Sequence, residues 1–346
     1  MTTTTTATEK PTLAANQSFA TAEAAKALLP VRDFGAHKWG VGGLIVVAGS
    51  PAYPGAAILT TRAAGRAGAG IVLLATGRGV IGATASAVPE VAHIPLPETD
   101  APGAARRAME QIEEHLEKAK AVLVGPGLGR DEAAGELLSV LFALGNKREA
   151  ERRRHNIGFA SASQATVAGK EEATPSTSAL FQRDDLTVVV DADALNWLAE
   201  QGEWWTSLPE GRLVLTPHVG EFAKLTGKTT DEVIADPLGE LETAATTWKQ
   251  TVVLKYGYTA ASDGTTTVVA EDAPLSLATA GSGDVLAGTI AALTAQGLRG
   301  LDAATIALHA GPAAARAVET RLGTLGLIAT DLPDAIAEQM ASLARS

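Results

Sequence analysis

Short apolar runs rich in Val, Ile and Leu alternate with longer Ala-rich stretches along most of this 346-residue chain. A strand that reads as a continuous apolar run is typically buried on both faces, as in a parallel sheet covered by helices. The alternation therefore predicts an α/β fold with a central, mostly parallel sheet and helices on both faces, in three layers. The expected strands are Leu44–Ala48, Ile71–Ala75, Val91–Ile94, Ala121–Val124, Thr187–Asp191, Leu213–Thr216 and Thr251–Leu254.

The stretches between these runs are expected to be helices, and the chain after Asp284 is expected to be almost wholly helical. The helices expected before Asp284 are Gly55–Gly68, Ala104–Lys120, Asp131–Leu144, Ala194–Glu200, Gly220–Leu225 and Leu241–Lys249. The helices expected after it are Val285–Gln296, Leu301–Val318 and Ala329–Leu343.

Two segments interrupt the alternation and define the expected domain organisation. Residues 1–18 are polar and Thr-rich, which predicts a disordered tail. Residues 146–184 are rich in Ser, Thr, Ala and charge, and so long a structureless loop is unusual inside a compact domain. We interpret them as a disordered insertion rather than a domain linker, because the same alternation continues on both sides. A single domain over residues 19–346 is therefore expected.

The composition disfavours several classes of protein. The formal net charge of −11 argues against nucleic-acid binding, which needs clustered Lys and Arg, and the basic run Arg152–His155 is interpreted as a solvated loop. The chain has no Cys, so disulfides, thiolate nucleophiles and Cys-based zinc sites are excluded. No apolar run reaches the roughly 18–20 residues of a membrane span. The N-terminus lacks the features of a signal peptide, so a cytoplasmic protein is expected.

The segment Gly281-Ser-Gly-Asp284 opens an expected helix. Glycines before a helix let backbone N–H groups approach an oxyanion, and the helix start adds unpaired donors and the positive end of the dipole. The backbone of Ala280, Gly281, Ser282 and Gly283 is therefore a candidate anion hole, and Asp284 is the candidate catalytic acid. The alternative is that Asp284 serves only as a helix N-cap.

The segment Lys255-Tyr-Gly-Tyr-Thr259 follows directly on an expected strand. Ligands of α/β sheets bind at the carboxyl ends of the strands, so Lys255 could pair with a phosphate while Gly257 lets the backbone turn beneath a purine. The alternative is an ordinary strand exit with an exposed Lys.

Two other expected strands end in acidic segments. In Thr216-Pro-His-Val-Gly-Glu221, His218 could contact a polar ligand and Glu221 could hold a magnesium-bound water. Asp191 and Asp193 form a carboxylate pair that could bind Mg²⁺ or orient a hydroxyl. The alternatives are a helix-capping role for Glu221, and Asp193 as an N-cap with Asp191 satisfied by backbone donors.

The run Gly125-Pro-Gly-Leu-Gly129 predicts a tight strand-to-helix turn that brings the backbone to a ligand. It is not the G-x-G-x-x-G fingerprint of dinucleotide-binding oxidoreductases, and the chain has no Walker A pattern. An oxidoreductase is therefore disfavoured.

In this order, the motifs resemble the nucleotide-dependent (S)-NAD(P)H-hydrate dehydratase family, a branch of the ribokinase-like superfamily. The resemblance extends from about Leu28 to Gly326 and is interrupted by the insertion. It rests on His37-Lys38, Val46–Ser50, Pro54–Ala57, Gly125–Gly129, Asp191–Asn196, Thr216–Glu221, Lys255–Thr259 and Gly281–Asp284. Trp39, where the family usually has Gly, and the long insertion are departures. No epimerase domain is present, so the chain resembles a stand-alone bacterial member.

The resemblance implies roles for the matched residues. Ala57, Gly127 and His218 would contact the hydrated nicotinamide nucleotide, with Asp284 against its hydroxyl group. Glu221 would act on Mg²⁺ through a bound water, because His218–Glu221 takes the place of the superfamily's Asn-x-x-Glu metal motif. The adenine nucleotide would be bound by Lys255, Tyr256, Gly257, Tyr258, Thr259 and Gly283.

The implied activity is the repair of NADHX and NADPHX, reduced cofactors damaged by addition of water, with ADP or ATP as the phosphoryl donor. The resemblance also implies a separate NAD(P)H-hydrate epimerase as pathway partner, and a homotetramer. Two alternatives remain open from the sequence. One is a ribokinase-like kinase for a vitamin precursor, and the other is a nucleotide-binding regulator without catalysis.

Overall fold

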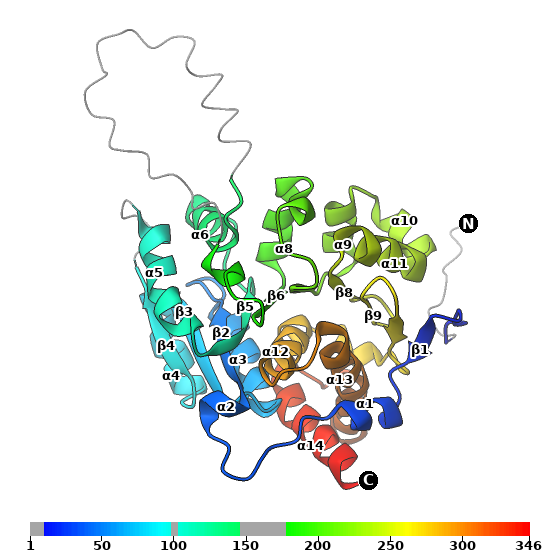
Figure 1. The fold of residues 1–346 in the computed structure, drawn as a ribbon. Helices are drawn as coiled ribbons and strands as arrows, with labels where there is room; N and C mark the ends of the chain where they lie inside the picture. The colour runs from blue at the N-terminus through cyan, green and yellow to red at the C-terminus, as the bar shows by residue number, and fades with distance from the viewer. Residues whose placement is uncertain (1–9, 98–102, 146–177) are drawn as a thin grey trace, which may run out of the picture.

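The computed structural model describes residues 10–97, 103–145 and 178–346. Their ten strands form one sheet, in the order β1-β10-β9-β8-β7-β6-β5-β2-β3-β4 (Figure 1). The strands are β1 Gln17–Phe19, β2 Gly43–Val47, β3 Ile71–Gly77, β4 Ala92–Leu96, β5 Ala119–Val124, β6 Thr187–Val190, β7 Leu213–Leu215, β8 Thr251–Leu254, β9 Ala260–Ser262 and β10 Thr267–Val269.

The sheet is parallel except around β9, which pairs antiparallel with both β8 and β10. Strand β2 lies between β3 and β5, pairing parallel with each. The chain runs outward from β2 through β3 to β4 and then returns to place β5 on the other side of β2. The boundary between β2 and β5 is therefore a topological switch point, where open α/β sheets bind their ligands.

Helices cover both faces of the sheet, as the sequence predicted (Figure 1). The core on one face includes side chains of α5 Ala104–Leu116, α6 Glu132–Phe142, α8 Asp193–Leu198, α9 Val219–Thr226, α10 Thr230–Ala235 and α11 Pro237–Trp248. The core on the other face includes side chains of α1 Ala22–Leu28, α3 Pro54–Arg66, α4 Arg78–Ala87, α12 Ser282–Ala295, α13 Gly300–Leu322 and α14 Leu332–Arg345. The short α2 is Lys38–Gly42.

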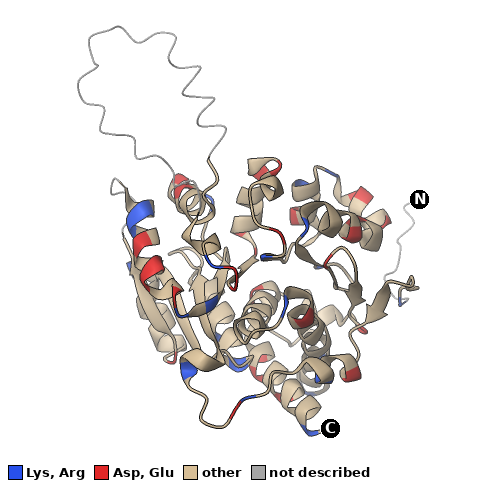
Figure 2. Ribbon diagram, in the orientation of Figure 1, with Lys and Arg blue, Asp and Glu red and all other residues tan. Residues whose placement is uncertain are grey.

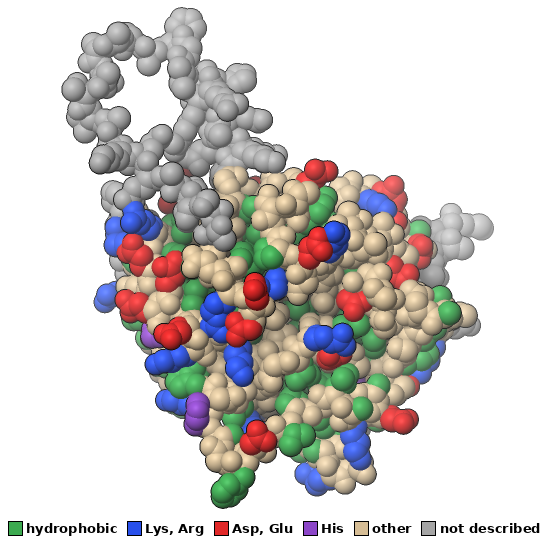
Figure 3. Space-filling view, viewed as in Figure 1, with side chains coloured by type: hydrophobic (Ala, Val, Ile, Leu, Met, Phe, Trp, Pro, Cys, Tyr) green, Lys and Arg blue, Asp and Glu red, His purple; other side chains and the backbone are tan. Residues whose placement is uncertain are grey.

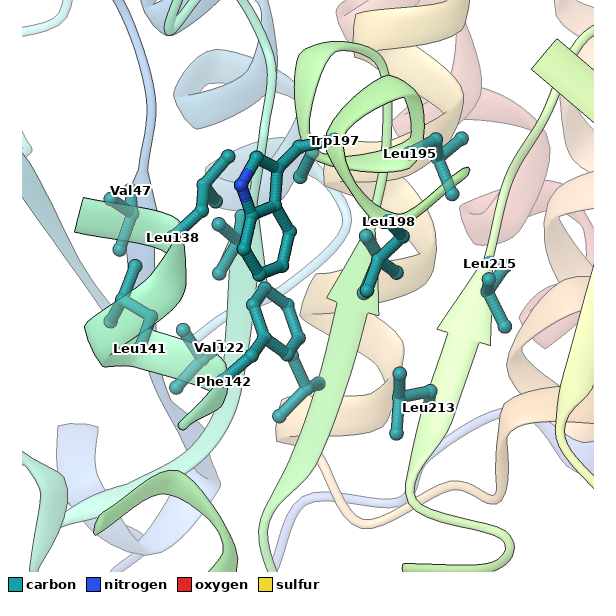
Figure 4. Packing of buried hydrophobic residues seen from close by; sticks show 14 of the residues in the cluster. Val47, Val122, Leu138, Leu141, Phe142, Leu195, Trp197, Leu198, Leu213 and Leu215 are labelled. Carbon is teal, nitrogen blue, oxygen red and sulfur yellow. The ribbon is translucent and has the colours of Figure 1, made fainter. Parts of the chain in front are cut away.

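The strands supply alternate residues to the two cores because successive side chains point to opposite faces. Ile45 and Val47 of β2 belong to one core, and Leu44 and Val46 belong to the other. In the first core, the rings of Phe142 and Trp197 stack with their centroids 5.8 Å apart, among leucines of α6, α8 and β7 (Figure 4). Burial of each large apolar side chain contributes about 1.5–3 kcal/mol, so the two cores fix the sheet that carries the site.

All seven expected strands are confirmed, and their ends differ from the expected ones by at most two residues. Strands β1, β9 and β10 were not expected, because each is only three residues long and carries polar or small residues. The expected helix Ala104–Lys120 ends at Leu116, since Ala119 already begins β5. Helices α1, α2, α4 and α10 were also not expected.

The expected tail over residues 1–18 needs a correction at its end. Gln17–Phe19 forms β1, which pairs parallel with β10, so the polar segment is ordered before residue 19. The expected insertion 146–184 also ends earlier, because Leu180 is fully buried and Arg183 donates hydrogen bonds to the carbonyls of Glu117 and Ala119. The rest of the insertion lies outside the described residues.

Charged residues of both signs are mixed over the helices and loops (Figure 2). Among the helices that the structure describes, none is both long enough and apolar enough to cross a membrane.

Candidate active site at the carboxyl edge of the sheet

The loops that leave the carboxyl ends of β2, β5, β6, β7 and β8 carry most of the residues singled out in the sequence. In a parallel sheet these ends lie along one edge. The first turn of α12 supplies the remaining group, and Gly283 in that turn approaches Lys255 after β8. The structure therefore brings together motifs that lie far apart in the sequence.

Two glycines of the turn after β5 are packed too tightly for a β-carbon. Gly125 has φ +129°, and a β-carbon there would lie 1.8 Å from the carbonyl oxygen of Asp191. Gly127 has φ +63°, and its β-carbon would lie 2.8 Å from Cβ of Ala56 and 2.9 Å from Cβ of Tyr53. The turn is thus wedged between the end of β6 and the start of α3, across the switch point.

Asp193 holds the far end of this turn. Its carboxylate accepts a hydrogen bond from the backbone N–H of Gly129 at 2.9 Å and pairs with Arg130 at 3.1 Å. Asp193 is the first residue of α8, and Ala192 occupies the N-cap position. The alternative of Asp193 as an N-cap is therefore wrong, because its side chain is committed to the glycine turn.

Asp191 lies at the end of β6 and is 1% exposed. Its Oδ1 accepts hydrogen bonds from Oγ1 of Thr216 at 2.7 Å and from Nζ of Lys255 at 2.8 Å. The alternative that Asp191 is satisfied by backbone donors is wrong, because these partners are side chains on neighbouring strand ends. Despite its burial, Lys255 has a pKa above its ordinary value, because Asp191 and then Glu221 favour the charged ammonium.

His218 and Glu221 form a capping box at the start of α9. Nδ1 of His218 accepts from the backbone N–H of Gly220 at 3.0 Å, and Glu221 accepts from the N–H of His218 at 2.9 Å. The capping alternative for Glu221 is therefore confirmed. Because Nδ1 is the acceptor, a neutral His218 ring carries its proton on Nε2. Burial, followed by the charge of Lys255, lowers the pKa of His218, which favours the neutral ring.

The start of α12 contains Gly281 as N-cap, with φ +90° and no side-chain cap. Asp284 is the third residue of the helix, so the alternative that it is the N-cap is wrong. Ser282 donates its backbone N–H to the carbonyl of Thr279 at 3.3 Å, so this one of the four expected anion-hole donors already has a partner. Its hydroxyl also points back, donating to the carbonyl of Leu277 at 2.8 Å.

Asp284 has a pKa raised to about 7, first by burial and then by the negative charge of Asp191, while Lys255 opposes the shift. The pKa of Glu221 is also raised to about 7, again mainly by burial. Lys255 thus lies in the electrostatic field of three carboxylates, those of Asp191, Glu221 and Asp284. A carboxyl group with a pKa near 7 can take up or release a proton at neutral pH.

A pocket of about 530 Å³ adjoins this cluster. Its polar side is formed by expected nucleotide-binding residues: Lys255, Tyr256, Gly257, Thr259 and Gly283. Its apolar side is formed by the segment around Leu277 and by α13 and α14. Tyr258 does not line this pocket and packs against the core instead. The volume falls in the range of small-molecule sites, about 300–1,000 Å³.

Sequence reasoning missed the charged rim of this pocket. Asp272 lines the pocket, and both its oxygens pair with Arg316 of α13, at 2.6 and 2.8 Å. No motif marked this pair, because its members are 44 residues apart in the sequence. Thr216 belongs to the Thr216–Glu221 motif, but the motif gives no sign of its hydrogen bond to Asp191.

The expected contact between Ala57 and a substrate stays a prediction. Ala57 is fully buried in α3, whereas Tyr53 at the N-cap of this helix is 58% exposed beside Gly127. No feature of the sequence indicated that Tyr53 would be exposed beside the glycine turn.

The sequence profile of the NAD(P)H-hydrate dehydratase family matches residues 44–149 and 165–338, and the gap between the two ranges lies inside the expected insertion. The chain belongs to the NAD(P)H-hydrate dehydratase family. A bifunctional NAD(P)H-hydrate repair enzyme from Salinibacter ruber is 34% identical over 90% of this chain and 51% of its own length. The chain spans about half the length of the bifunctional relatives it matches.

An ADP-dependent (S)-NAD(P)H-hydrate dehydratase from Xanthomonas campestris is 30% identical over 88% of this chain and 90% of its own length. Among solved structures, a ribokinase-like superfamily protein from Enterococcus faecalis superposes with a TM-score of 0.75, at 17% identity, over 98% of this chain and all of its own. The Bacillus subtilis ADP/ATP-dependent NAD(P)H-hydrate dehydratase, co-crystallised with ATP and Mg²⁺, superposes with a TM-score of 0.68 at 22% identity. The superposition covers 95% of this chain and 100% of that one. The fold of this dehydratase-family chain is therefore ribokinase-like.

Proposed function

We propose that this chain catalyses the nucleotide-dependent dehydration of the S-epimers of NADHX and NADPHX to NADH and NADPH. The observation that carries the proposal is the position of Asp284. This acid, with its pKa raised to about 7, lies at the start of α12 in a chain of the dehydratase family. The neighbouring pocket has room for a nucleotide and is lined by the expected nucleotide-binding residues.

In the proposed reaction, Asp284 accepts the proton of the ring hydroxyl as that oxygen attacks the terminal phosphorus of ADP or ATP. The bond from this phosphorus to its bridging oxygen breaks, and AMP or ADP departs. The phosphate then leaves the ring with the electrons of the C–O bond, pushed by the lone pair of the ring nitrogen. Loss of a proton from the adjacent ring carbon restores the dihydropyridine. General-base assistance of this kind typically contributes about 10²–10⁴-fold.

The adenine nucleotide would occupy the pocket beside Lys255–Thr259, with its phosphates toward Lys255 and the start of α12. The backbone donors of Ala280, Gly281 and Gly283 and the dipole of α12 would stabilise the negative charge of the transferred group. Loss of one such donor costs about 10²–10³-fold in other enzymes. The fourth candidate donor, Ser282, would first have to release Thr279.

The hydrated nicotinamide nucleotide would lie against the turn at Gly127, the region of Ala57, and His218. The side chain of His218 is 59% exposed. Its Nε2 lies 3.5 Å from Oε1 of Glu221, and because Nδ1 is occupied by the backbone, Nε2–H is the group that would donate to a polar group of the substrate.

Mg²⁺ is expected with the nucleotide, and it would neutralise charge on the phosphates. Mg²⁺ commonly uses one or two carboxylates together with phosphates and waters. The residues present fit this mode, because the buried carboxylate of Glu221 lies in the field of Lys255 and Asp191 beside the pocket. We propose that Glu221 acts on the ion through a bound water.

The test is an assay with purified NADHX, run with ADP, with ATP and without nucleotide, that follows the absorbance of the dihydropyridine. Recovery of NADH with at least one nucleotide, and none without, is the expected result. The preference between ADP and ATP is read from the same assay. Phosphorylation of a vitamin-precursor alcohol without recovery of NADH would point to a kinase instead. Tight nucleotide binding with no turnover of either substrate would point to a regulator.

We also propose an NAD(P)H-hydrate epimerase as pathway partner, because the matched relatives include bifunctional repair enzymes of about twice the matched length. Such a partner would convert the R-epimer into the substrate used here. We propose a cytoplasmic location, where nicotinamide nucleotides are used.

A homotetramer is the assembly we propose. Its support is exposed apolar surface: Val31 and Phe34 in the loop between α1 and α2 are 90% and 110% exposed, and Leu325 after α13 is 100% exposed. Figure 3 shows hydrophobic side chains at the lower end of the molecule, where Figure 1 places the loop between α1 and α2. Light scattering of the wild type and of Phe34→Ser with Leu325→Ser tests this, and a monomeric wild type would refute it.

A further inference from the structure

Asp191 is a buried carboxylate fixed from both its backbone and its side chain. Its N–H donates to the carbonyl of Val124 at 3.1 Å, and its own carbonyl packs against Gly125 so closely that no β-carbon fits between them. Its Oδ1 accepts from both Thr216 and Lys255, at 2.7 and 2.8 Å. With 2% of its side chain exposed, this carboxylate has little access to solvent or to a hydrated ion.

The backbone of Lys255 is fixed by strand pairing, whereas its long side chain needs a partner to fix the ammonium group. Its N–H donates to the carbonyl of Pro217 at 2.8 Å, which continues the strand pairing beyond β8. Its side chain is 19% exposed, lines the nucleotide pocket, and ends 3.2 Å from the position that a β-carbon would take at Gly283. The ammonium therefore lies between the pocket and the first turn of α12.

We propose that Asp191 is a positioning residue, whose carboxylate holds the ammonium of Lys255 at the first turn of α12 to meet a phosphate of the nucleotide. This role replaces the expected one of Asp191 as a magnesium ligand. The inference rests on the proposed function for the identity of the phosphate, and on the contacts of Asp191 for the positioning itself.

The physical reason lies in the flexibility of the lysine side chain and in its competing partners. A four-carbon side chain loses considerable rotamer entropy when fixed, so a cation that must act in one place needs a fixed partner. Glu221 and Asp284 also attract the Lys255 ammonium. A direct pair with Asp284 would occupy the expected base, so the pair with Asp191 keeps the cation close to Asp284 while leaving that carboxylate available.

The test is a double-mutant cycle with Asp191→Asn, Lys255→Met and both changes, measuring kcat and KM for NADHX and the affinity for a fluorescent ADP analogue. We expect Asp191→Asn to lower kcat by about 100-fold, as a misplaced catalytic group does. The double variant should be no worse than Lys255→Met, since Asp191 acts only through Lys255. Losses that multiply in the double variant, or a kcat near wild type in Asp191→Asn, would overturn the proposal.

Two further variants separate positioning from charge and folding. Lys255→Arg keeps both charges but moves the cation, so kcat should still fall; unchanged kcat would contradict a positional role. Asp302→Asn removes one carboxylate from the Arg299 ion pair, which does not line the pocket, and should leave kcat unchanged. Lys255→Arg also keeps the proposal testable if Asp191→Asn does not fold.

The magnesium alternative has its own readout. If Asp191 ligates Mg²⁺, Asp191→Asn will raise the Mg²⁺ concentration needed for half-maximal rate while Lys255→Met will not, and this outcome would overturn the positioning role. If the wild type does not convert NADHX, the proposed function fails, but the same cycle can be read on ADP affinity alone. Non-additive losses of affinity would still support the positioning of Lys255, and additive losses would refute it.

Discussion

Gly283 faces Lys255 so closely that a β-carbon at position 283 would lie 3.2 Å from Nζ. The backbone of Gly283 does not lie in the left-handed region, so an alanine there is conformationally possible. The contact is with the far end of the Lys255 side chain, and that end must shift by a few tenths of an ångström. Substitution at position 283 therefore tests the cation without unfolding the helix.

Gly283→Ala is expected to leave the fold intact and to weaken nucleotide binding by about tenfold, equivalent to ~1.4 kcal/mol. The displaced ammonium and the added methyl group both act at the expected phosphate position. The control is Gly82→Ala in α4, where a β-carbon meets nothing within 4 Å. This control should bind the nucleotide normally and gain up to about 1 kcal/mol of stability. Titration of a fluorescent ADP analogue distinguishes the two, and equal affinities would refute the expectation.

Asp284→Asn should fold and bind the nucleotide yet lose turnover by about 10²–10⁴-fold, since the amide cannot accept the hydroxyl proton. Single-turnover measurements with NADHX and ADP test this. Near wild-type turnover in the variant would show that another group acts as the base.

The rate should depend on pH through Asp284. Because its pKa is raised to about 7, the carboxyl group is protonated below that pH and cannot serve as base. We expect kcat/KM for NADHX to rise with pH through about 7 and then level off. A profile that stays flat between about pH 6 and pH 8 would contradict the assignment.

The same shift predicts a cost in stability. The folded state retains a proton on Asp284 at pH values where the unfolded chain, with the ordinary pKa of 3.8, has released it. The free energy of unfolding should therefore fall as pH rises from about 4 to about 7. Asp284→Asn removes this contribution, while that of Glu221 remains. Thermal unfolding across this range should show a smaller decline in the variant, and parallel curves would refute the prediction.

Gly127→Ala should destabilise the protein more than Gly129→Ala. Both positions have positive φ, +63° and +89°, and both would cost an alanine about 1–2 kcal/mol. Only at Gly127 does the new carbon also collide, with Ala56 and Tyr53, whereas at Gly129 it meets nothing within 4 Å. The difference between the two variants in the free energy of unfolding, measured with urea, gives the cost of the collision with Ala56 and Tyr53. Equal losses of unfolding free energy in the two variants would show that Gly127 is not tightly packed against Ala56 and Tyr53.

The regular part of the fold could be predicted from the sequence because buried parallel strands leave a direct mark on it. Runs such as Val188–Val190 are apolar at every position, since both faces of the sheet are covered. The part of the sheet beyond β8 could not be predicted in this way, because β9 and β10 are only three residues long each and include the polar residues Ser262 and Thr267. Their pairing depends on contacts between strands rather than on periodicity.

The members of the site could be predicted, but not their partners. Lys255 and Asp191 were each recognised at a strand end, yet neither motif indicates that the two form a pair 64 residues apart. Strand order determines that neighbourhood, and order is a tertiary property. The pair of Asp272 with Arg316 shows the same limit, because its only signal is its position in the folded chain.

Ala192 separates the two carboxylates of the Asp191-Ala-Asp193 segment with φ +52° and ψ −117°, a backbone conformation that side chains rarely adopt and that costs about 1–3 kcal/mol. The bend directs Asp191 toward Lys255, which lines the 530 Å³ pocket, and Asp193 toward the glycine turn. Under the proposed function, this one strained residue sets the spacing between the positions of the nucleotide and of the hydrated nicotinamide. A change in its backbone angles would move the proposed phosphoryl donor and the acceptor hydroxyl relative to each other, so the geometry of the proposed reaction is maintained at a cost in the free energy of folding.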